Sequence, residues 1–376
     1  MAAAYSEGML DPVQARGRQK RLLQVVYDRK LDAAVVGLSK NVYYFTAHLP
    51  FWQQYAGFVL LGDGRSTLLT ANQPNRDAAA DDIESYEASW NGTQRQEQQM
   101  VVATTLVQLL KRRGVKRIGF DVSAVSAVVA GEFGGHCEPI DPDLFQLRRR
   151  KDPDELALMK VAIGCTRAMY ERARQIIEPG VPELRVYAEL HAAAVQVAGE
   201  PLSDFLGNDY ACGQPGGPPR KAHVAGAGQL YVLDLGPAYR GYFSDNCRTF
   251  SVDRKPTDAQ MKAWNIVAGA FPIVERTARP GAHCQAIYQA VDDYYRGQGP
   301  GAPGFPHHLG HGVGLQPHEF PHLNPKWDDV LMEGEVFTAE PGLYGQELGG
   351  GLRLENQYLV RADGVENLTP FRMQFV

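Results

Sequence analysis

The chain has 376 residues, of which 44% are hydrophobic and 22% are charged, with a formal net charge of −5 at pH 7. Such a chain is long enough for two domains and has the composition of an ordinary soluble globular protein. The net charge gives no reason to expect a nucleic acid or an acidic membrane as a partner. The five cysteines form no CxxC pair, so neither a disulfide framework nor a thiolate zinc site is indicated.

Residues 1–147 alternate between helical and β-rich patterns. An amphipathic helix is expected at 21–31, and a second helix, ended by a glycine, is expected at 101–114. Short β-rich runs follow the pattern of strands in an α/β domain, at 33–38, 55–62, 66–71 and 116–122. The first residues show no apolar core of a signal peptide, and no apolar run approaches the ~18 residues of a spanning helix, so we expect a cytoplasmic protein.

Residues 148–376 show one order of elements twice. An N-cap Asp followed by Pro, at 152–153, opens a long helix that ends at the Pro-Gly of 179–180; a second helix and strands follow. A capping-box signature at 257–260 then opens a helix that runs to the Pro-Gly of 280–281, again followed by a helix and strands. This repetition predicts an internally duplicated C-terminal domain.

Five of the ten histidines lie in residues 305–322, FPHHLGHGVGLQPHEFPH. The last five residues match HExxH, the helical motif in which two histidines of a zinc protease bind the metal. Pro321 lies between the two histidines, where an interior proline would disrupt such a helix by about 3 kcal/mol or more. Pro317 stands just ahead of the first histidine, and the upstream glycines add to the penalty. We therefore expect extended chain and turns here, and no zinc-protease helix.

Two pairs of carboxylates lie within apolar strands of the two repeats. Asp234 and Asp245 are equidistant from residues 239–240, so a β-hairpin with that loop would make them direct cross-strand neighbours with Cβ atoms about 5 Å apart. Glu340 and Glu355 are likewise symmetric about a longer loop. Like charges placed face to face destabilise a sheet, and burial raises the cost. Two divalent ions would neutralise four carboxylates, with a fifth ligand from the histidine-rich segment; exposed hairpin acids are the alternative for either pair alone.

The sequence resembles a known family, the creatinase/aminopeptidase P/prolidase class of pita-bread metallopeptidases. The resemblance covers nearly the whole chain and is carried by LRRRKDPDELALMKVA, LDLGPAYRGYFSDNCRTF, HHLGHGVGLQPHEFP, FTAEPGLY and GLRLEN. It implies an α+β protein, with a smaller creatinase-like α/β domain over 1–147 and a pita-bread catalytic domain over 148–376.

The resemblance implies a dinuclear metal site whose ligands are Asp234, Asp245, His311, Glu340 and Glu355. Asp245 and Glu355 would bridge the two ions, His311 and Glu340 would bind one of them, and Asp234 would bind the other. An oxygen-rich site with one imidazole suits manganese, which is the metal expected, and also cobalt, zinc or iron.

The resemblance also implies the roles of residues around the metals. His318 would bind the scissile carbonyl or the tetrahedral intermediate, His307 would line the substrate pocket, and Arg353 would orient a carboxylate ligand. The ions would share a water and lower its pKa, so that a bridging hydroxide attacks the carbonyl while Glu340 relays the proton to the leaving nitrogen. One metal and His318 would stabilise the developing oxyanion.

The sequence departs from the family pattern in substrate-binding positions. The Pro-His pair that the family places before its first Asp ligand is replaced by Pro-Arg at 219–220, and His223 lies only eleven residues before Asp234. Either His223 has taken over the substrate-binding role or Arg220 has replaced it. Asn356 also stands where the family usually has an Asp after its last Glu ligand. The histidines without a family role, at 308 and 322, are expected to be structural or solvent-facing.

The leading hypothesis is a metal-dependent exopeptidase that hydrolyses Xaa-Pro bonds of small peptides, as an aminopeptidase P or a prolidase-like dipeptidase. The alternative is a pita-bread enzyme acting on a non-peptide small molecule, as a creatinase-like hydrolase or a metal-dependent lyase. A catalytically inactive binding module is a third hypothesis, but it predicts lost ligands, and none is lost. A homodimer or homotetramer is expected, in which the aromatic pair at 51–52 either caps a neighbour's site or packs in the core.

Overall fold

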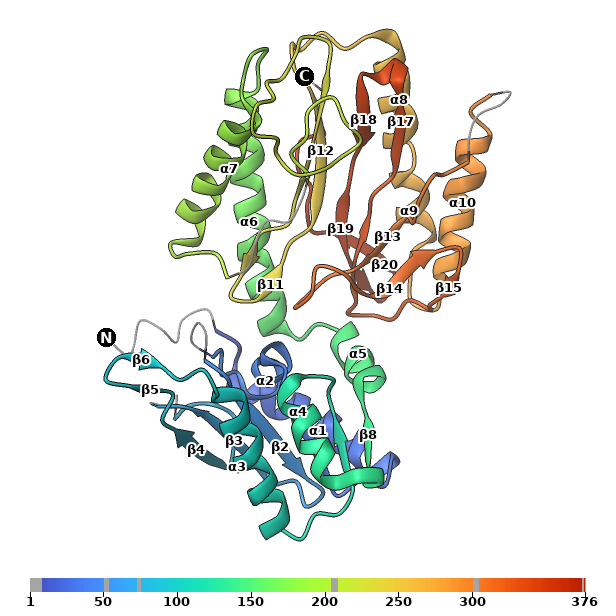
Figure 1. The fold of residues 1–376 in the computed structure, drawn as a ribbon. Helices are drawn as coiled ribbons and strands as arrows, with labels where there is room; N and C mark the ends of the chain where they lie inside the picture. The colour runs from blue at the N-terminus through green and yellow to red at the C-terminus, as the bar shows by residue number, and fades with distance from the viewer. Residues whose placement is uncertain are drawn as a thin grey trace. The chain divides into compact units, whose positions relative to one another are not determined.

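The computed structural model describes residues 9–50, 54–72, 76–203, 209–299, 304–373 and 375. They form two compact units that divide between Arg148 and Arg149 (Figure 1). The aromatic pair at 51–52 lies outside the described residues. Among the helices that are described, none combines the length and the apolar character needed to cross a lipid bilayer.

The N-terminal unit is built on a mixed six-stranded sheet with the strand order β4-β3-β2-β1-β7-β8. Helices α3 and α4 contribute apolar residues to the same core as the strands, so the predicted α/β character of this unit is confirmed. Its elements are α1 (Pro12–Asp28), β1 (Ala33–Val36), α2 (Ser39–Thr46), β2 (Gly57–Leu61), β3 (Ser66–Ala71), β4 (Asp82–Tyr86), β5 (Ser89–Trp90), β6 (Thr93–Gln94), α3 (Gln98–Arg112), β7 (Ile118–Phe120), α4 (Ala124–Phe133), η2 (Gly134–His136), β8 (Cys137–Pro139) and α5 (Asp141–Arg149).

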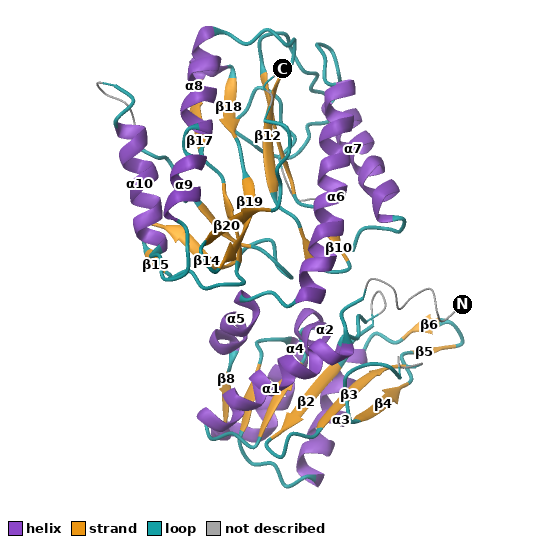
Figure 2. Ribbon diagram, turned by 180° about the vertical axis from the view of Figure 1, so that it is seen from behind, coloured by secondary structure: helices purple, strands orange, loops and turns teal. Residues whose placement is uncertain are grey.

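The C-terminal unit places strands between two groups of helices: α6 and α7 lie on one side, and α8, α9 and α10 on the other (Figure 2). Its widest sheet has the order β15-β14-β13-β16-β19-β20, and β9–β12, β10–β11 and β17–β18 form separate pairs. Its elements are α6 (Pro153–Ile176), α7 (Glu183–Ala198), β9 (Leu230–Leu235), β10 (Ala238–Tyr239), β11 (Tyr242–Phe243), β12 (Asn246–Ser251), α8 (Asp258–Ala268), α9 (Phe271–Thr277), α10 (Cys284–Arg296), β13 (Gly310–Gly312), β14 (Glu319–Asn324), β15 (Trp327–Asp328), β16 (Val336–Ala339), β17 (Gly342–Gly345), η3 (Gln346–Leu348), β18 (Gly350–Arg353), β19 (Asn356–Arg361) and β20 (Gly364–Asn367).

Each helical group has its own apolar core against part of the strands. One core joins α6 and α7 to β9 and β12, and the other joins α8, α9 and α10 to β14, β16, β18 and β19. The capping box predicted at the start of α8 is present. At the start of α6 the predicted N-cap residue, Asp152, also belongs to a capping box, in which Asp152 N donates to Glu155 Oε2 at 2.8 Å. The element order therefore repeats as predicted, with the acidic strands of each copy between the two helical groups.

The prediction of one continuous helix from 257 to the Pro-Gly of 280–281 is wrong. The structure breaks it into α8 and α9, and Pro272 lies in the first turn of α9. A continuous helix would bring the Pro272 ring against the carbonyl four residues earlier and would lose a backbone hydrogen bond. The break at Gly269–Ala270 avoids that clash, and the proline instead occupies a first-turn position, where no N–H is required.

Candidate metal centre

Asp234 lies on β9, and Asp245 immediately precedes β12. The ladder pairs Asp234 with Cys247, so the predicted direct facing of Asp234 and Asp245 is wrong. The hairpin turns at Arg240 and Gly241, whose φ values of 46° and 87° are both positive, as the tight turn between paired strands requires. The turn therefore lies one residue later than predicted. Asp245 is two residues before Cys247 and is thus a diagonal neighbour of Asp234 on the same face.

Glu340 and Glu355 lie between two ladders that share one register. The β16–β19 ladder pairs Ala339 with Asn356, and the β17–β18 ladder pairs Gly342 with Arg353. Glu340, the residue after Ala339, is consequently opposite Glu355, the residue before Asn356. This predicted cross-strand relation is confirmed.

His311 is the central residue of β13, between two glycines. A Cβ atom on Gly310 would lie 1.9 Å from the carbonyl oxygen of Thr338, and one on Gly312 would lie 2.0 Å from that of Phe320. Only glycine allows the neighbouring backbones to approach this closely. The next part of the segment, from Glu319, is strand β14, so the predicted extended conformation of the HExxH match is confirmed.

The five predicted ligands converge. Ligand atoms of Asp245, His311 and Glu355 all lie within 4.8 Å of one another, and all three residues are buried. The Nε2 atom of His311 lies 3.4 Å from Oε1 of Glu340 and 3.7 Å from Oδ2 of Asp245. Asp234 is close enough to raise the pKa of Asp245.

Their electrostatics are those of a crowded acidic cluster. Burial, followed by repulsion from neighbouring carboxylates, raises the pKa values of Asp245 and Glu355 well above the usual range. Burial disfavours the charged form of both His311 and Glu340, but their mutual hydrogen bond and attraction outweigh it. They raise the pKa of His311 to about 9 and lower that of Glu340 to about 2. Without a cation the cluster therefore retains protons.

Two oxygens of this cluster test whether a metal fits. Within the described part of the chain, Asp234 Oδ1 and Glu355 Oε2 are buried and have no hydrogen-bond partner. Buried polar atoms are normally paired, and a carboxylate oxygen is a good ligand for a divalent cation. The site thus offers four carboxylates and one imidazole, and two of the carboxylate oxygens have no hydrogen-bond partner among the described residues. This set of ligands fits divalent metal ions.

Arg353 connects the acidic cluster to further polar residues. Its Nη2 donates to Asp234 Oδ2 at 2.7 Å and also contacts the carboxylate of Asp209, while Nη1 donates to the Tyr344 hydroxyl at 3.2 Å. His307 Nε2 lies 2.9 Å from the same hydroxyl. Arg353 thus lies against a predicted ligand, as expected, and His307 belongs to the same network. No role was derived from the sequence for Asp209 or Tyr344.

The remaining histidines of residues 305–322 differ in whether they lie at the acidic cluster. The exposed ring of His318 stacks on His311, with centroids 3.6 Å apart. His308, expected to be structural or solvent-facing, has Nδ1 3.4 Å from Glu340 Oε1 and lies at the site. His322 instead pairs with Asp329, at 3.2 Å, which agrees with the structural role expected for it.

Arg220 and His223 both contact Glu183, in the first turn of α7. Arg220 Nη2 lies 2.6 Å from Glu183 Oε1, and His223 Nε2 lies 3.7 Å from the same oxygen of this fully buried carboxylate. The structure thus groups both residues with Glu183, and the substrate-binding role of either one stays a prediction. Asn356 is buried and accepts a hydrogen bond from Arg248 at 2.9 Å.

Comparison with known proteins covers both units. Residues 157–362 match Metallopeptidase family M24, and residues 18–139 match the Creatinase/Prolidase N-terminal domain. The chain is 26% identical over 366 residues to an Xaa-Pro dipeptidase of Pyrococcus horikoshii, across 95% of this chain and 98% of that protein.

Two solved structures illustrate the similarity of fold. An Xaa-Pro dipeptidase from Bacillus anthracis is similar with a TM-score of 0.82 and 24% identity, over 96% of this chain and 99% of the other. An X-Pro aminopeptidase from Thermotoga maritima is similar with a TM-score of 0.78 and 23% identity, over 95% and 98%. At these identities the two structures establish the fold alone.

Proposed function

The chain belongs to Metallopeptidase family M24, and from that membership we propose that it is an exopeptidase that hydrolyses Xaa-Pro bonds of small peptides. The observation that carries the proposal is the convergence of His311 with the buried carboxylates of Asp245 and Glu355, beside orphaned oxygens that fit a cation. The relative from Pyrococcus horikoshii is an Xaa-Pro dipeptidase, and it is similar to this chain along almost its whole length. This similarity supports Xaa-Pro peptides as the substrate class.

Two divalent cations would be held by Asp234, Asp245, His311, Glu340 and Glu355, with manganese as the first candidate and cobalt, zinc or iron as the others. When bound, they would supply Lewis acidity and a water of lowered pKa.

The chain's own residues position the substrate and move the proton. Glu340, hydrogen-bonded to His311, would accept a proton and deliver it to the leaving nitrogen. His318 has an exposed ring beside His311, from which it can donate to the substrate carbonyl oxygen as negative charge develops. Arg353 would hold Asp234 in place through its 2.7 Å hydrogen bond.

A peptide panel tests the proposal. Metal-stripped protein is reconstituted with Mn²⁺, Co²⁺ or Zn²⁺ and assayed on Xaa-Pro dipeptides, Xaa-Pro-Yaa tripeptides and matched Xaa-Ala controls. Metal-dependent cleavage confined to the proline peptides is expected, and the ratio of dipeptide to tripeptide rates distinguishes a dipeptidase from an aminopeptidase. Binding of two metal equivalents without cleavage of any peptide would contradict the proposed substrate class.

We propose a homodimer or homotetramer as the form in solution, which light scattering would test. Arg220 stands where the family pattern has a histidine, and it pairs with Glu183. Arg220→His would test the effect of this departure on proline preference.

A further inference from the structure

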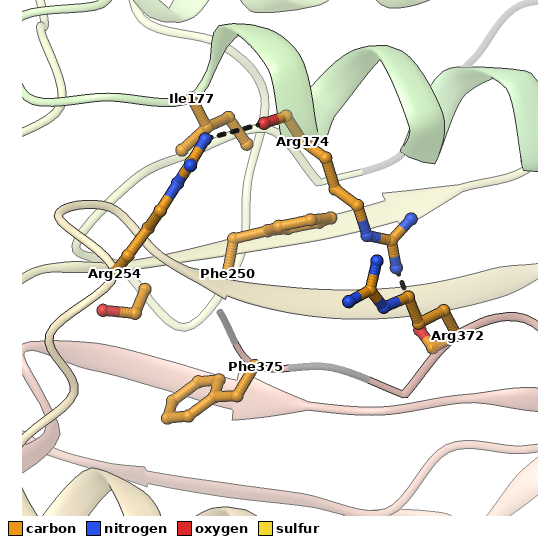
Figure 3. A pocket seen from close by; sticks show the side chains of 7 residues that line it. Arg174, Ile177, Phe250, Arg254, Arg372 and Phe375 are labelled. Atoms are coloured by element: carbon orange, nitrogen blue, oxygen red, sulfur yellow. Dashed lines mark hydrogen bonds between the residues drawn. The ribbon is translucent and has the colours of Figure 1, made fainter.

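A cavity lined by several arginines lies in the C-terminal unit. It has a volume of about 250 Å³ and is lined by Arg174, Ile177, Phe250, Ser251, Arg254, Arg372 and Phe375 (Figure 3). The three arginines come from distant parts of the chain: Arg174 from the last turns of α6, Arg254 from the turn after β12, and Arg372 from the segment after β20. We call this cavity the arginine pocket.

The arginine pocket collects the positive charge of three arginines. The described residues that line it include no acid, and none of its three arginines forms an ion pair with them or elsewhere in the described ranges. The nearby acid Glu171 acts on Arg174 only through its charge. Arg254 Nη2 donates to the carbonyl oxygen of Arg174, and Arg174 Nη2 donates to that of Arg372, each at 3.0 Å. Backbone carbonyls thus hold the guanidinium groups of Arg174 and Arg254 in place but do not neutralise them, and Arg372 takes part in these bonds through its carbonyl oxygen.

The guanidinium groups of Arg174 and Arg372 lie next to each other (Figure 3). Burial, together with the charge of Arg372, lowers the pKa of Arg174 below its usual value. Two like charges that lie close together, one of them half-buried, are unfavourable unless a counter-ion is present. An anion in the cavity would reverse the sign of that interaction.

The walls of the arginine pocket define the chemistry of such an anion. A guanidinium group presents a rigid fork of N–H donors that matches the oxygens of a phosphate group. The Arg174 guanidinium lies over the Phe250 ring, 5.7 Å from its centroid, which fixes the side chain. Phe250, Phe375 and Ile177 add apolar surface for an organic portion of the ligand. A neighbouring cavity is lined by Arg167, Arg174 and Arg372 and by one acid, Glu171, among others, so it adds one further arginine to this surface.

The arginine pocket is separate from the metal centre. Cys247 pairs with Asp234, so these two side chains share one face of the β9–β12 ladder. Phe250, three residues beyond Cys247, points to the opposite face, where it packs against Tyr170 of α6. At about 3.3 Å per residue, the backbone positions of Asp245 and Phe250 are also about 16 Å apart along the strand.

We propose that the arginine pocket binds a small phosphate-bearing anion. Isothermal titration calorimetry of the full chain with inorganic phosphate tests this, in metal-free and metal-loaded protein. Phosphate bound at the metal centre would be detected only in the loaded protein, whereas binding in the arginine pocket is expected in both. Adenosine monophosphate as a second probe distinguishes a phosphorylated organic ligand, which would bind more tightly than free phosphate, from inorganic phosphate itself.

Arg174→Gln and Arg372→Gln are each expected to weaken phosphate binding to metal-free protein by about tenfold or more, because each removes charged hydrogen bonds. Arg276→Gln is the matched control: Arg276 is exposed in α9 and bonds only a backbone carbonyl, so its removal should leave the affinity unchanged. Both pocket variants should retain the parent's unfolding temperature and peptidase activity. The proposal is overturned if metal-free parent protein binds neither probe, or if correctly folded Arg174→Gln and Arg372→Gln bind them as the parent does.

Discussion

Arg353 Nη2 donates a 2.7 Å hydrogen bond to Oδ2 of Asp234, and the other oxygen of that carboxylate is buried without a hydrogen-bond partner in the described part of the chain. The same guanidinium contacts Asp209 and Tyr344. Arg353 thus fixes one oxygen of Asp234 and leaves the other available to a cation.

Arg353→Lys should weaken metal binding about 10- to 100-fold, the usual effect of losing a group that orients a metal ligand. A lysine ammonium keeps the charge but lacks the fork that reaches both carboxylates and Tyr344 at once. Metal affinity measured by calorimetry, with kcat on an Xaa-Pro dipeptide, checks the prediction. Arg361→Lys, at an exposed ion pair with Glu366, is the control and should match the parent. Parent-like metal affinity in Arg353→Lys would show that Arg353 does not orient Asp234.

Glu355→Gln should abolish stabilisation by metal without destabilising the metal-free fold. Burial and the neighbouring acids raise the pKa of Glu355 well above its usual range, and glutamine removes that repulsion with nearly the same shape. We expect the unfolding temperature in a chelator to equal or exceed that of the parent, and added Mn²⁺ to have little effect on it. Glu347→Gln, an exposed change in η3, should respond to Mn²⁺ as the parent does.

A lower unfolding temperature of Glu355→Gln in the chelator would contradict the prediction, because it would mean that the Glu355 side chain stabilises the metal-free fold. The same experiment reports on the parent: its unfolding temperature should rise with metal concentration, since the metal binds the native state.

Metal affinity should rise with pH. In the metal-free protein His311 has a pKa raised to about 9, and the raised pKa values of Asp245 and Glu355 also favour bound protons. A metal ion must displace these protons, so affinity should increase about tenfold per pH unit for each proton released, at pH values below the pKa of His311. Metal titrations at several pH values measure the slope. Asp245→Asn, with one fewer proton to release, should give a shallower slope, and a flat profile in the parent would contradict the prediction.

The sequence predicted the second acid pair better than the first for a physical reason. Glu340 and Glu355 lie between ladders of one register, so symmetry about the loop was sufficient to place them opposite each other. For Asp234 and Asp245 the register depends on which two residues form the turn, and positive φ at Arg240 was not evident from its residue type. A one-residue shift of the turn changes every cross-strand partner.

Contacts from irregular segments were not predictable from periodicity. Asp209 reaches Arg353 from a stretch without helical or strand pattern, and His308 was set aside although it lies beside Glu340. The helix break before Pro272 had a local signal, a proline inside a helical pattern. Local rules therefore placed the elements and most of the predicted ligands, while tertiary contacts completed the network around them.

His318→Gln should reduce kcat about 100- to 1,000-fold while two metal equivalents remain bound. The exposed His318 ring stacks on His311 but is not one of the five proposed ligands, so its loss should affect stabilisation of the oxyanion rather than metal affinity. Metal content measured on the purified variant, together with steady-state kinetics on an Xaa-Pro dipeptide, separates the two effects. His283→Gln, at an exposed pair with Asp328, is the control and should keep the parent's kcat. Parent-like turnover by His318→Gln with both metals bound would remove His318 from the catalytic residues.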